Sequence, residues 1–154
     1  CSGEPNSQYQ VDTGQGHLEE LGYTCTQYAF SDSNDMAAVT QTAADNSDVI
    51  YVPTDNTVAS NASIVDNICR PAKIPVFTGE QGICKGCGVA TLSISYYDLG
   101  VTTGEMAVKV LRGEADISQM PIEYAPQFTK MYNQDICDDL GLTPPVGYTA
   151  LDAE

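Results

Sequence analysis

Residues 48–52, Asp-Val-Ile-Tyr-Val, constrain the fold more than any other stretch of the chain. They form a short apolar run rich in β-branched side chains, which is typical of a strand buried on both faces of a sheet. Polar residues follow at once, and a helical pattern over residues 58–69 comes next. Because segments of these two kinds alternate along the chain, the sequence predicts an α/β fold with a parallel sheet flanked by helices.

The same reasoning places the other elements. A helix is expected from Asn6 to about Leu21, where Ser7 and Gln10 form a capping pattern and Gly22 ends the helix. A glycine-rich loop is expected over residues 79–88. The remaining expected elements are strands over 24–29, 74–78, 89–94 and 122–128, and helices that begin at 33–35, at Asp98 (ended by Gly113) and at Gln134 (134–140).

The charge of the chain excludes some classes of partner. Acidic residues number 21 and basic residues 6, which gives a net charge of −15. This balance argues against nucleic acid, whose binding depends on Lys and Arg, and against an anionic membrane surface. No apolar run is long enough to span a membrane. Residues 1–7 are typical of the loop after a strand, so we expect the chain to be a fragment.

Candidate ligand residues follow three of the predicted strands. In open α/β sheets, ligands bind beyond the carboxyl ends of the strands, where helix N-termini present unpaired N–H groups. Segments 4–7, 53–57 and 78–80 hold this position. Their short polar side chains are also the types that cap helices, so capping and ligand contact are about equally open at each position. Judged by itself, Glu80 is more typical of a solvated loop carboxylate than of a ligand group. The candidates are Asn6, Ser7, Asp55, Asn56, Thr57 and Glu80.

The cysteines and the histidine indicate no catalytic or metal site. Cys84 and Cys87 form a CxxC motif without a second pair or a nearby histidine, so it does not predict a zinc site. Its expected place in a loop is unlike a redox motif that opens a helix, and a local disulfide and two free thiols both fit. His17 is expected to be exposed in mid-helix, and residues 79–88 contain no phosphate-binding motif. We therefore expect no enzyme activity, no cofactor and no metal.

Several long strings resemble a known family in the same order. Two of them are Asp48-Val-Ile-Tyr-Val-Pro-Thr-Asp-Asn-Thr-Val-Ala-Ser60 and Gly88-Val-Ala-Thr-Leu-Ser-Ile-Ser-Tyr-Tyr-Asp-Leu-Gly100. Residues 2–7, 103–107 and 110–114 add to them. Together they resemble an ABC-transporter substrate-binding family whose studied members take up aromatic amino acids such as tryptophan.

The resemblance implies the type I periplasmic-binding-protein fold, in which two α/β lobes joined by crossover strands close on a solute. Residues 1–78 would then form the first part of the C-terminal lobe, and residues 79–115 would pack on the N-terminal lobe. Residues 116–154 would return to the C-terminal lobe and end in a tail. Most of the N-terminal lobe would be absent, so the candidate residues would form half of a site.

The resemblance also implies roles for the candidate residues toward an amino-acid zwitterion. Asp55 would hold the ammonium group through charge-assisted bonds, with Glu80 as a second candidate. Asn6 and Ser7, at a helix N-terminus, would hold the carboxylate, and Asn56 could serve either group. Closure would be a hinge motion between the lobes.

The implied partners are a small amino acid and the membrane permease of an ABC importer. The implied location is extracytoplasmic, as a cell-surface lipoprotein or a periplasmic protein, where Cys84 and Cys87 could form a structural disulfide. Two other hypotheses remain open: an effector-sensing lobe of a LacI-type transcription regulator, and a redox or hydrolytic enzyme that uses Cys84, Cys87 or His17. The acidic charge and the lack of a helix-turn-helix disfavour the first.

Overall fold

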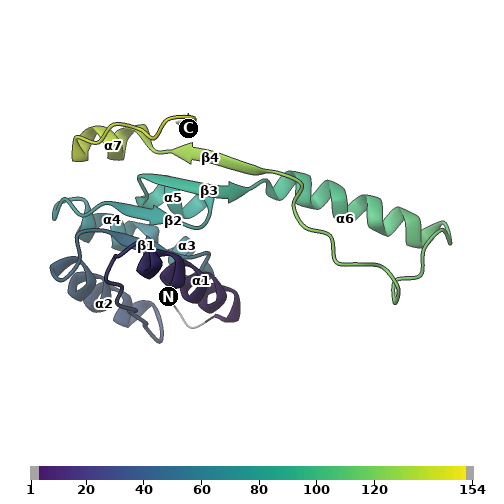
Figure 1. The fold of residues 1–154 in the computed structure, drawn as a ribbon, viewed down its shortest axis with the longest axis horizontal. Helices are drawn as coiled ribbons and strands as arrows, with labels where there is room; N and C mark the ends of the chain where they lie inside the picture. Colours follow the sequence, from purple (N-terminus) through teal and green to yellow (C-terminus); the bar gives the residue numbers. More distant parts are fainter. Residues whose placement is uncertain (1–3, 152–154) are drawn as a thin grey trace. The chain divides into compact units, whose positions relative to one another are not determined.

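The computed structural model describes residues 4–151, apart from the side chain of Asn6. The chain divides into two compact units, and Figure 1 shows the course of the ribbon through both. Unit 1 is Cys1–Leu92 with Lys130–Glu154, and unit 2 is Ser93–Thr129. The chain therefore leaves unit 1 once and returns to it.

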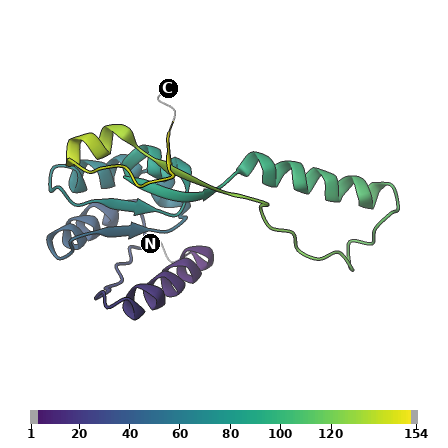
Figure 2. The same cartoon turned by 45° about the horizontal axis from the view of Figure 1, so that its top comes forward.

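The sheet has five strands in the order β1-β2-β3-β4-β5. They are β1 (Ile50–Val52), β2 (Val76–Thr78), β3 (Ala90–Ile94), β4 (Phe128–Tyr132) and β5 (Thr149–Ala150). Strand β2 runs parallel to both β1 and β3, and β5 runs parallel to β4. The predicted α/β architecture, a mostly parallel sheet flanked by helices, is confirmed, and Figure 2 gives a second view of it.

Six helices belong to unit 1. They are α1 (Pro5–Glu20), α2 (Ser33–Asp45), α3 (Asn56–Ser60), α4 (Ala62–Cys69), α5 (Gln81–Cys87) and α7 (Gln134–Leu140). The main hydrophobic core joins residues of α2, α3, α4 and α5 to β1 and β2, with Met36 and Ile83 fully buried. A smaller cluster packs Ile136 and Cys137 of α7 against Val89 and Ala90. Apolar burial of this kind supplies most of the stabilisation of a domain.

Local signals in the sequence predicted several of these elements correctly. The run at 48–52 contains β1, the run at 89–94 contains β3, and the helix predicted over 134–140 is α7. The expected burial of β1 on both faces is wrong, since Tyr51 is exposed. Helix α2 begins at Ser33 as expected, with the side chain of Asp32 accepting a bond from the backbone N–H of Asn34 at 2.7 Å.

Two predicted strands are wrong. Residues 24–29 form no strand, and the side chain of Gln27 there bonds those of Asp12 and Gln15 on α1. The strand expected over 122–128 begins only at Phe128, as β4. In both segments the side-chain pattern suggested a strand. A strand forms only where the segment pairs with a neighbouring strand, which the local pattern does not determine.

The glycine-rich segment 79–88 is also not a loop, since it contains α5. Glycine lowers helix propensity, which hid this helix from the sequence pattern. Close packing explains why glycine is present. A Cβ atom on Gly86 would lie 2.5 Å from the Cβ of Ala62 on α4, so a larger residue would force the two helices apart.

Unit 2 contains the end of β3, helix α6 (Tyr96–Leu111), a segment without helix or strand, and the first residues of β4. Helix α6 begins at the cap residue Ser95, whose hydroxyl accepts a bond from Asp98 N at 3.1 Å, and the chain turns out of the helix at Gly113, where φ is +73°. No residue of α6 is buried. Residues 79–92 pack within unit 1, unit 2 begins at Ser93, and the chain returns to unit 1 at Lys130.

Within residues 4–151, no helix combines the length and apolarity needed to cross a lipid bilayer.

Candidate functional site

The three predicted ligand segments lie close together within unit 1, at the carboxyl ends of β1 and β2. The hydroxyl of Ser7, in the first turn of α1, donates to the carbonyl oxygen of Thr54 at 2.7 Å. Thr54 follows β1, and its hydroxyl donates to the carbonyl oxygen of Gly79, which follows β2, at 3.3 Å. The fold therefore brings segments 4–7, 53–57 and 78–80 to one edge, as the sequence predicted.

Gln10 joins this group through both ends of its side-chain amide. Its Oε1 accepts a bond from the backbone N–H of Thr54 at 2.8 Å, and its Nε2 donates to the hydroxyl of Thr54 at 3.1 Å. A Cβ atom on Gly79 would lie 2.8 Å from both Gln10 Oε1 and Thr54 N, so glycine is needed there. The sequence assigned Gln10 only to a capping pattern that the structure lacks, since the N-cap of α1 is Glu4 and has no side-chain capping bond.

Ser7 and Asp55 face the interior of the protein. Ser7 is 0% exposed and Asp55 is 1% exposed. Asp55 is the N-cap of α3, and its Oδ1 accepts a bond from Val58 N at 3.0 Å. At these two positions the side chains make capping and packing contacts within the protein. The solute contacts that the family resemblance implied stay predictions.

Glu80 is likewise a helix cap. Its two carboxylate oxygens accept bonds from the backbone N–H groups of Gly82, at 2.8 Å, and of Ile83 in the first turn of α5. The side chain is almost fully buried. The expectation of a solvated loop carboxylate is therefore wrong, and the capping bonds account for this acidic residue without a ligand.

Other polar groups remain accessible at the same edge. Asn56 is exposed and Thr57 is half-buried, both in the first turn of α3. Glu4, half-buried, accepts bonds at its Oε2 from Asn56 Nδ2 at 3.0 Å and from Asn56 N at 3.5 Å. The sequence did not single out Glu4. The side chain of Asn6 lies outside the described part of the structure.

The CxxC motif is buried rather than placed at a surface. Cys84 is 0% exposed and Cys87 is 2% exposed, and both are free thiols, so the alternative of a local disulfide is not the one that the structure shows. Burial raises the pKa of both thiols to about 12. It also raises the pKa of Cys69, in the same core, to about 11. Catalytic thiols have lowered pKa values and are accessible, so this motif lacks the properties of a redox centre.

Native-state thiol labelling should reflect this burial. At pH 8, Cys69, Cys84 and Cys87 should not react with a disulfide reagent such as DTNB until the protein unfolds, because the thiol form dominates well below a pKa of 11 to 12. The partly exposed Cys25 serves as the reactive internal control. Peptide mapping after labelling measures each site, and rapid native labelling of Cys84 or Cys87 would contradict the structure.

The remaining candidates for chemistry are weak. His17 is exposed on α1 as predicted, and its Nδ1 lies 3.6 Å from Glu20 Oε2. Among the described residues, no group of three or more His, Cys, Asp or Glu side chains is arranged to hold a metal ion.

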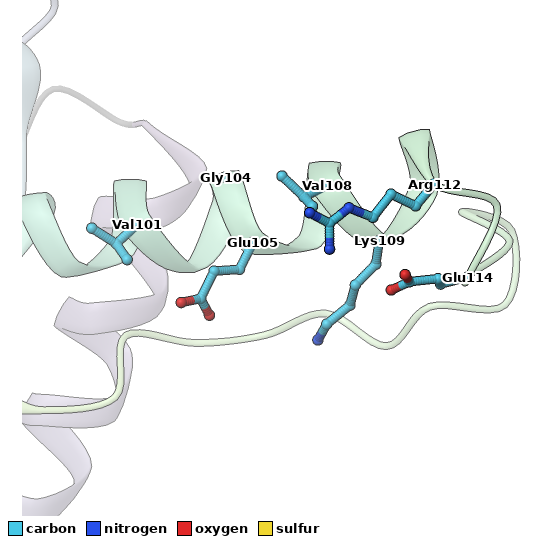
Figure 3. Close-up of a pocket in the computed structure, with 7 residues that line it drawn as sticks. All are labelled: Val101, Gly104, Glu105, Val108, Lys109, Arg112 and Glu114. Carbon is cyan, nitrogen blue, oxygen red and sulfur yellow. The ribbon is translucent and has the colours of Figure 1, made fainter.

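Unit 2 contains a separate open pocket along α6. Figure 3 shows its lining residues, which come from α6 and from Arg112 and Glu114 just beyond it. They mix apolar groups such as Val101 and Val108 with charges of both signs, including Glu105 and Lys109. None of the predicted site residues lines this pocket, so it is not the candidate site.

Residues 1–146 match the protein family described as ABC transporter substrate binding protein. The chain belongs to this family. The resemblance drawn from the sequence strings is therefore confirmed, and the family is one of binding proteins.

Individual relatives agree with this membership. A tyrosine-binding protein from Clostridioides difficile is 30% identical over 132 residues, which cover 86% of this chain and 38% of that protein. The L-Trp complex of an ABC domain from Streptococcus pneumoniae has a TM-score of 0.87 at 30% identity, covering 97% of this chain and 54% of that one. The ligand-free, open structure of a substrate-binding protein with adhesive properties from Clostridium difficile has a TM-score of 0.74 at 34% identity, covering 99% of this chain and 52% of that one.

These likenesses confirm the predicted fold class, a substrate-binding protein fold of which this chain represents about one lobe. The chain spans 38% of the length of the tyrosine-binding protein and about half of each of the two solved structures.

Proposed function

We propose that this chain is part of the extracytoplasmic solute-binding component of an ABC importer, and that its solute is an amino acid with an aromatic side chain. Family membership supports the importer role. The names of two relatives, a tyrosine-binding protein and a domain solved with L-Trp, support the class of solute. No comparison favours a transcription regulator, and the buried CxxC motif disfavours a redox enzyme.

The observation that carries this proposal is the convergence of three polar segments at one edge of the sheet. The bonds among Ser7, Thr54 and Gly79 hold the start of α1 beside the ends of β1 and β2. Solutes commonly bind at this position in open α/β folds, because polar side chains and backbone N–H groups gather there. Asn56 is exposed and Thr57 is half-buried at that edge, so both are accessible to a solute.

The exposures suggest a division of roles for a zwitterionic solute. The accessible groups Asn56 and Thr57 are suited to donate to a carboxylate, and Glu4 is the nearby carboxylate suited to accept from an ammonium group. Ser7 and Asp55 would support these groups indirectly, through the bond of Ser7 to Thr54 and the cap that Asp55 forms on α3. Glu80 would hold the start of α5 near the same edge. Asn6, at the N-terminus of α1, remains a proposed carboxylate contact.

A second lobe would complete the site. Unit 2 exposes large apolar side chains in its free form, including Leu111 at 85% and Tyr97 at 82%. Apolar surface of this kind usually packs against another part of a protein. We propose that unit 2 contributes to the N-terminal lobe of a two-lobed protein, that the solute binds between the lobes, and that an ABC permease receives it. Secretion as a lipoprotein or into a periplasm belongs to the same proposal.

A ligand screen of the full-length protein tests the function. Tyrosine, tryptophan and phenylalanine should raise the melting temperature, because a ligand that binds only the folded state stabilises it by about 2.7 kcal/mol at a hundred times its Kd. Calorimetry should then give a one-to-one complex with an L-aromatic amino acid. Glutamate and lysine are controls that should give no shift. Binding of none of the twenty amino acids would refute the proposed function.

A further inference from the structure

Helix α1 is attached to unit 1 in an unusual way for a helix of 16 residues. Neither hydrophobic core cluster of the described structure includes a residue of α1, and its apolar residues Leu18 and Tyr9 are 38% and 73% exposed. Ser7 and Gln10 of α1 bond to Thr54, beyond the end of β1. Other side chains of α1 bond to Gln27, in the segment that follows the helix. Polar bonds therefore set the position of α1 where most helices rely on apolar packing.

The backbone N–H, the carbonyl oxygen and the hydroxyl of Thr54 all take part in hydrogen bonds. Gln10 accepts from its backbone N–H and donates to its hydroxyl, Ser7 donates to its carbonyl oxygen, and its own hydroxyl donates to the carbonyl oxygen of Gly79. The residue immediately precedes Asp55 and the first turn of α3. Any displacement of Thr54 would carry Asn56 and Thr57 with it.

We propose that Gln10 is a positioning residue for the solute site, which clamps the Thr54 loop to α1 so that the first turns of α1 and α3 face the solute together. This role rests on the proposed function of the site. Gln10 itself need not touch the solute. Its two-ended amide fixes both the distance and the orientation of the loop, which a single hydrogen bond would not do.

The clamp can be measured without any ligand. In the full-length protein, Gln10→Leu keeps the bulk of the side chain but removes both bonds. The Thr54 amide should then exchange its hydrogen about tenfold faster or more, since its acceptor is lost. Gln10→Glu should restore slow exchange, because a carboxylate oxygen can replace the amide Oε1 as the acceptor for the Thr54 N–H. The control is Gln41→Leu on α2, whose side chain bonds only to the exposed Asp45 in its own helix.

The same variants should separate positioning from general stability. Gln10→Leu should weaken aromatic amino-acid binding by about tenfold, as expected for two lost hydrogen bonds. The melting temperature of the ligand-free protein should change little, because α1 lies outside both core clusters. Thr54→Val should give a similar loss, and the double variant should lose less than the sum of the two, because both changes break one clamp.

Each outcome supports or overturns the positioning role of Gln10. Faster Thr54 exchange with weaker binding, rescue by Gln10→Glu and a non-additive double variant support the role. Unchanged exchange in Gln10→Leu, or faster exchange with unchanged affinity, overturns it. If the wild-type protein binds no amino acid at all, the proposed function fails and the positioning role fails with it, whereas the exchange result still reports whether the clamp exists.

Discussion

Replacing Asp55 with alanine in the full-length protein should weaken aromatic amino-acid binding by about tenfold or more. Asp55 caps α3 through its bond to Val58 N at 3.0 Å and is 1% exposed. Removing its carboxylate leaves a buried N–H group without this partner and loosens the turn that carries Asn56 and Thr57. Calorimetric titration with tyrosine or tryptophan measures the loss.

Asp55→Asn distinguishes the two ways in which Asp55 could act. Asparagine caps helices about as well as aspartate, so the variant keeps the structure of the turn while it removes the charge. If Asp55 supports the site from beneath, as its burial favours, Asp55→Asn should bind within about threefold of the wild type. If Asp55 pairs directly with the ammonium group, Asp55→Asn should lose as much affinity as Asp55→Ala. Unchanged binding in Asp55→Ala would remove this residue from the site altogether.

Ile83→Ala should lower the free energy of unfolding by about 2–5 kcal/mol. The side chain is 0% exposed and lies in the main core with Met36 and Val58. Its removal loses apolar burial and leaves a cavity in a cluster that connects α5 to α2 and α3. Chemical denaturation of the full-length protein, followed by circular dichroism, measures the change.

The matched control is Val49→Ala, beside β1. Val49 is 49% exposed, so its truncation should cost less than about 1 kcal/mol. Ile83→Val should fall between the two, at about 0.5–1.5 kcal/mol. Equal effects of Ile83→Ala and Val49→Ala would show that α5 does not pack into the core as described.

Local patterns explain which elements could be predicted from the sequence. The run at 48–52 is rich in apolar and β-branched residues, so its strand conformation as β1 could be predicted without knowledge of its neighbours. Its burial could not, since Tyr51 on one face of the strand is exposed. Helix α7 combines a capping residue, Asn133, with a glycine at 141 that takes φ +69° and ends the helix. Residues at the two ends of α7 therefore predict where the helix begins and ends.

Helix α5 shows why other elements could not be predicted. Its glycines weaken the helical signal, and the reason for Gly86 is the contact with Ala62, which lies on another helix. The strand expected over 24–29 failed for a related reason. Its side chains alternate, but the segment pairs with no strand of the described sheet, and the side chain of Gln27 bonds to α1.

The sequence by itself determined the α/β alternation, the family, and the three polar segments that meet at one edge of the sheet, because strand patterns, helix caps and family strings are local properties. Only the tertiary structure decided what each polar side chain does there. It turned Ser7, Asp55 and Glu80 inward, left Asn56 exposed and Thr57 half-buried, and joined Gln10 to Thr54. A capping residue and a ligand residue have the same chemistry, so the direction in which each side chain points, set by distant packing, makes the difference.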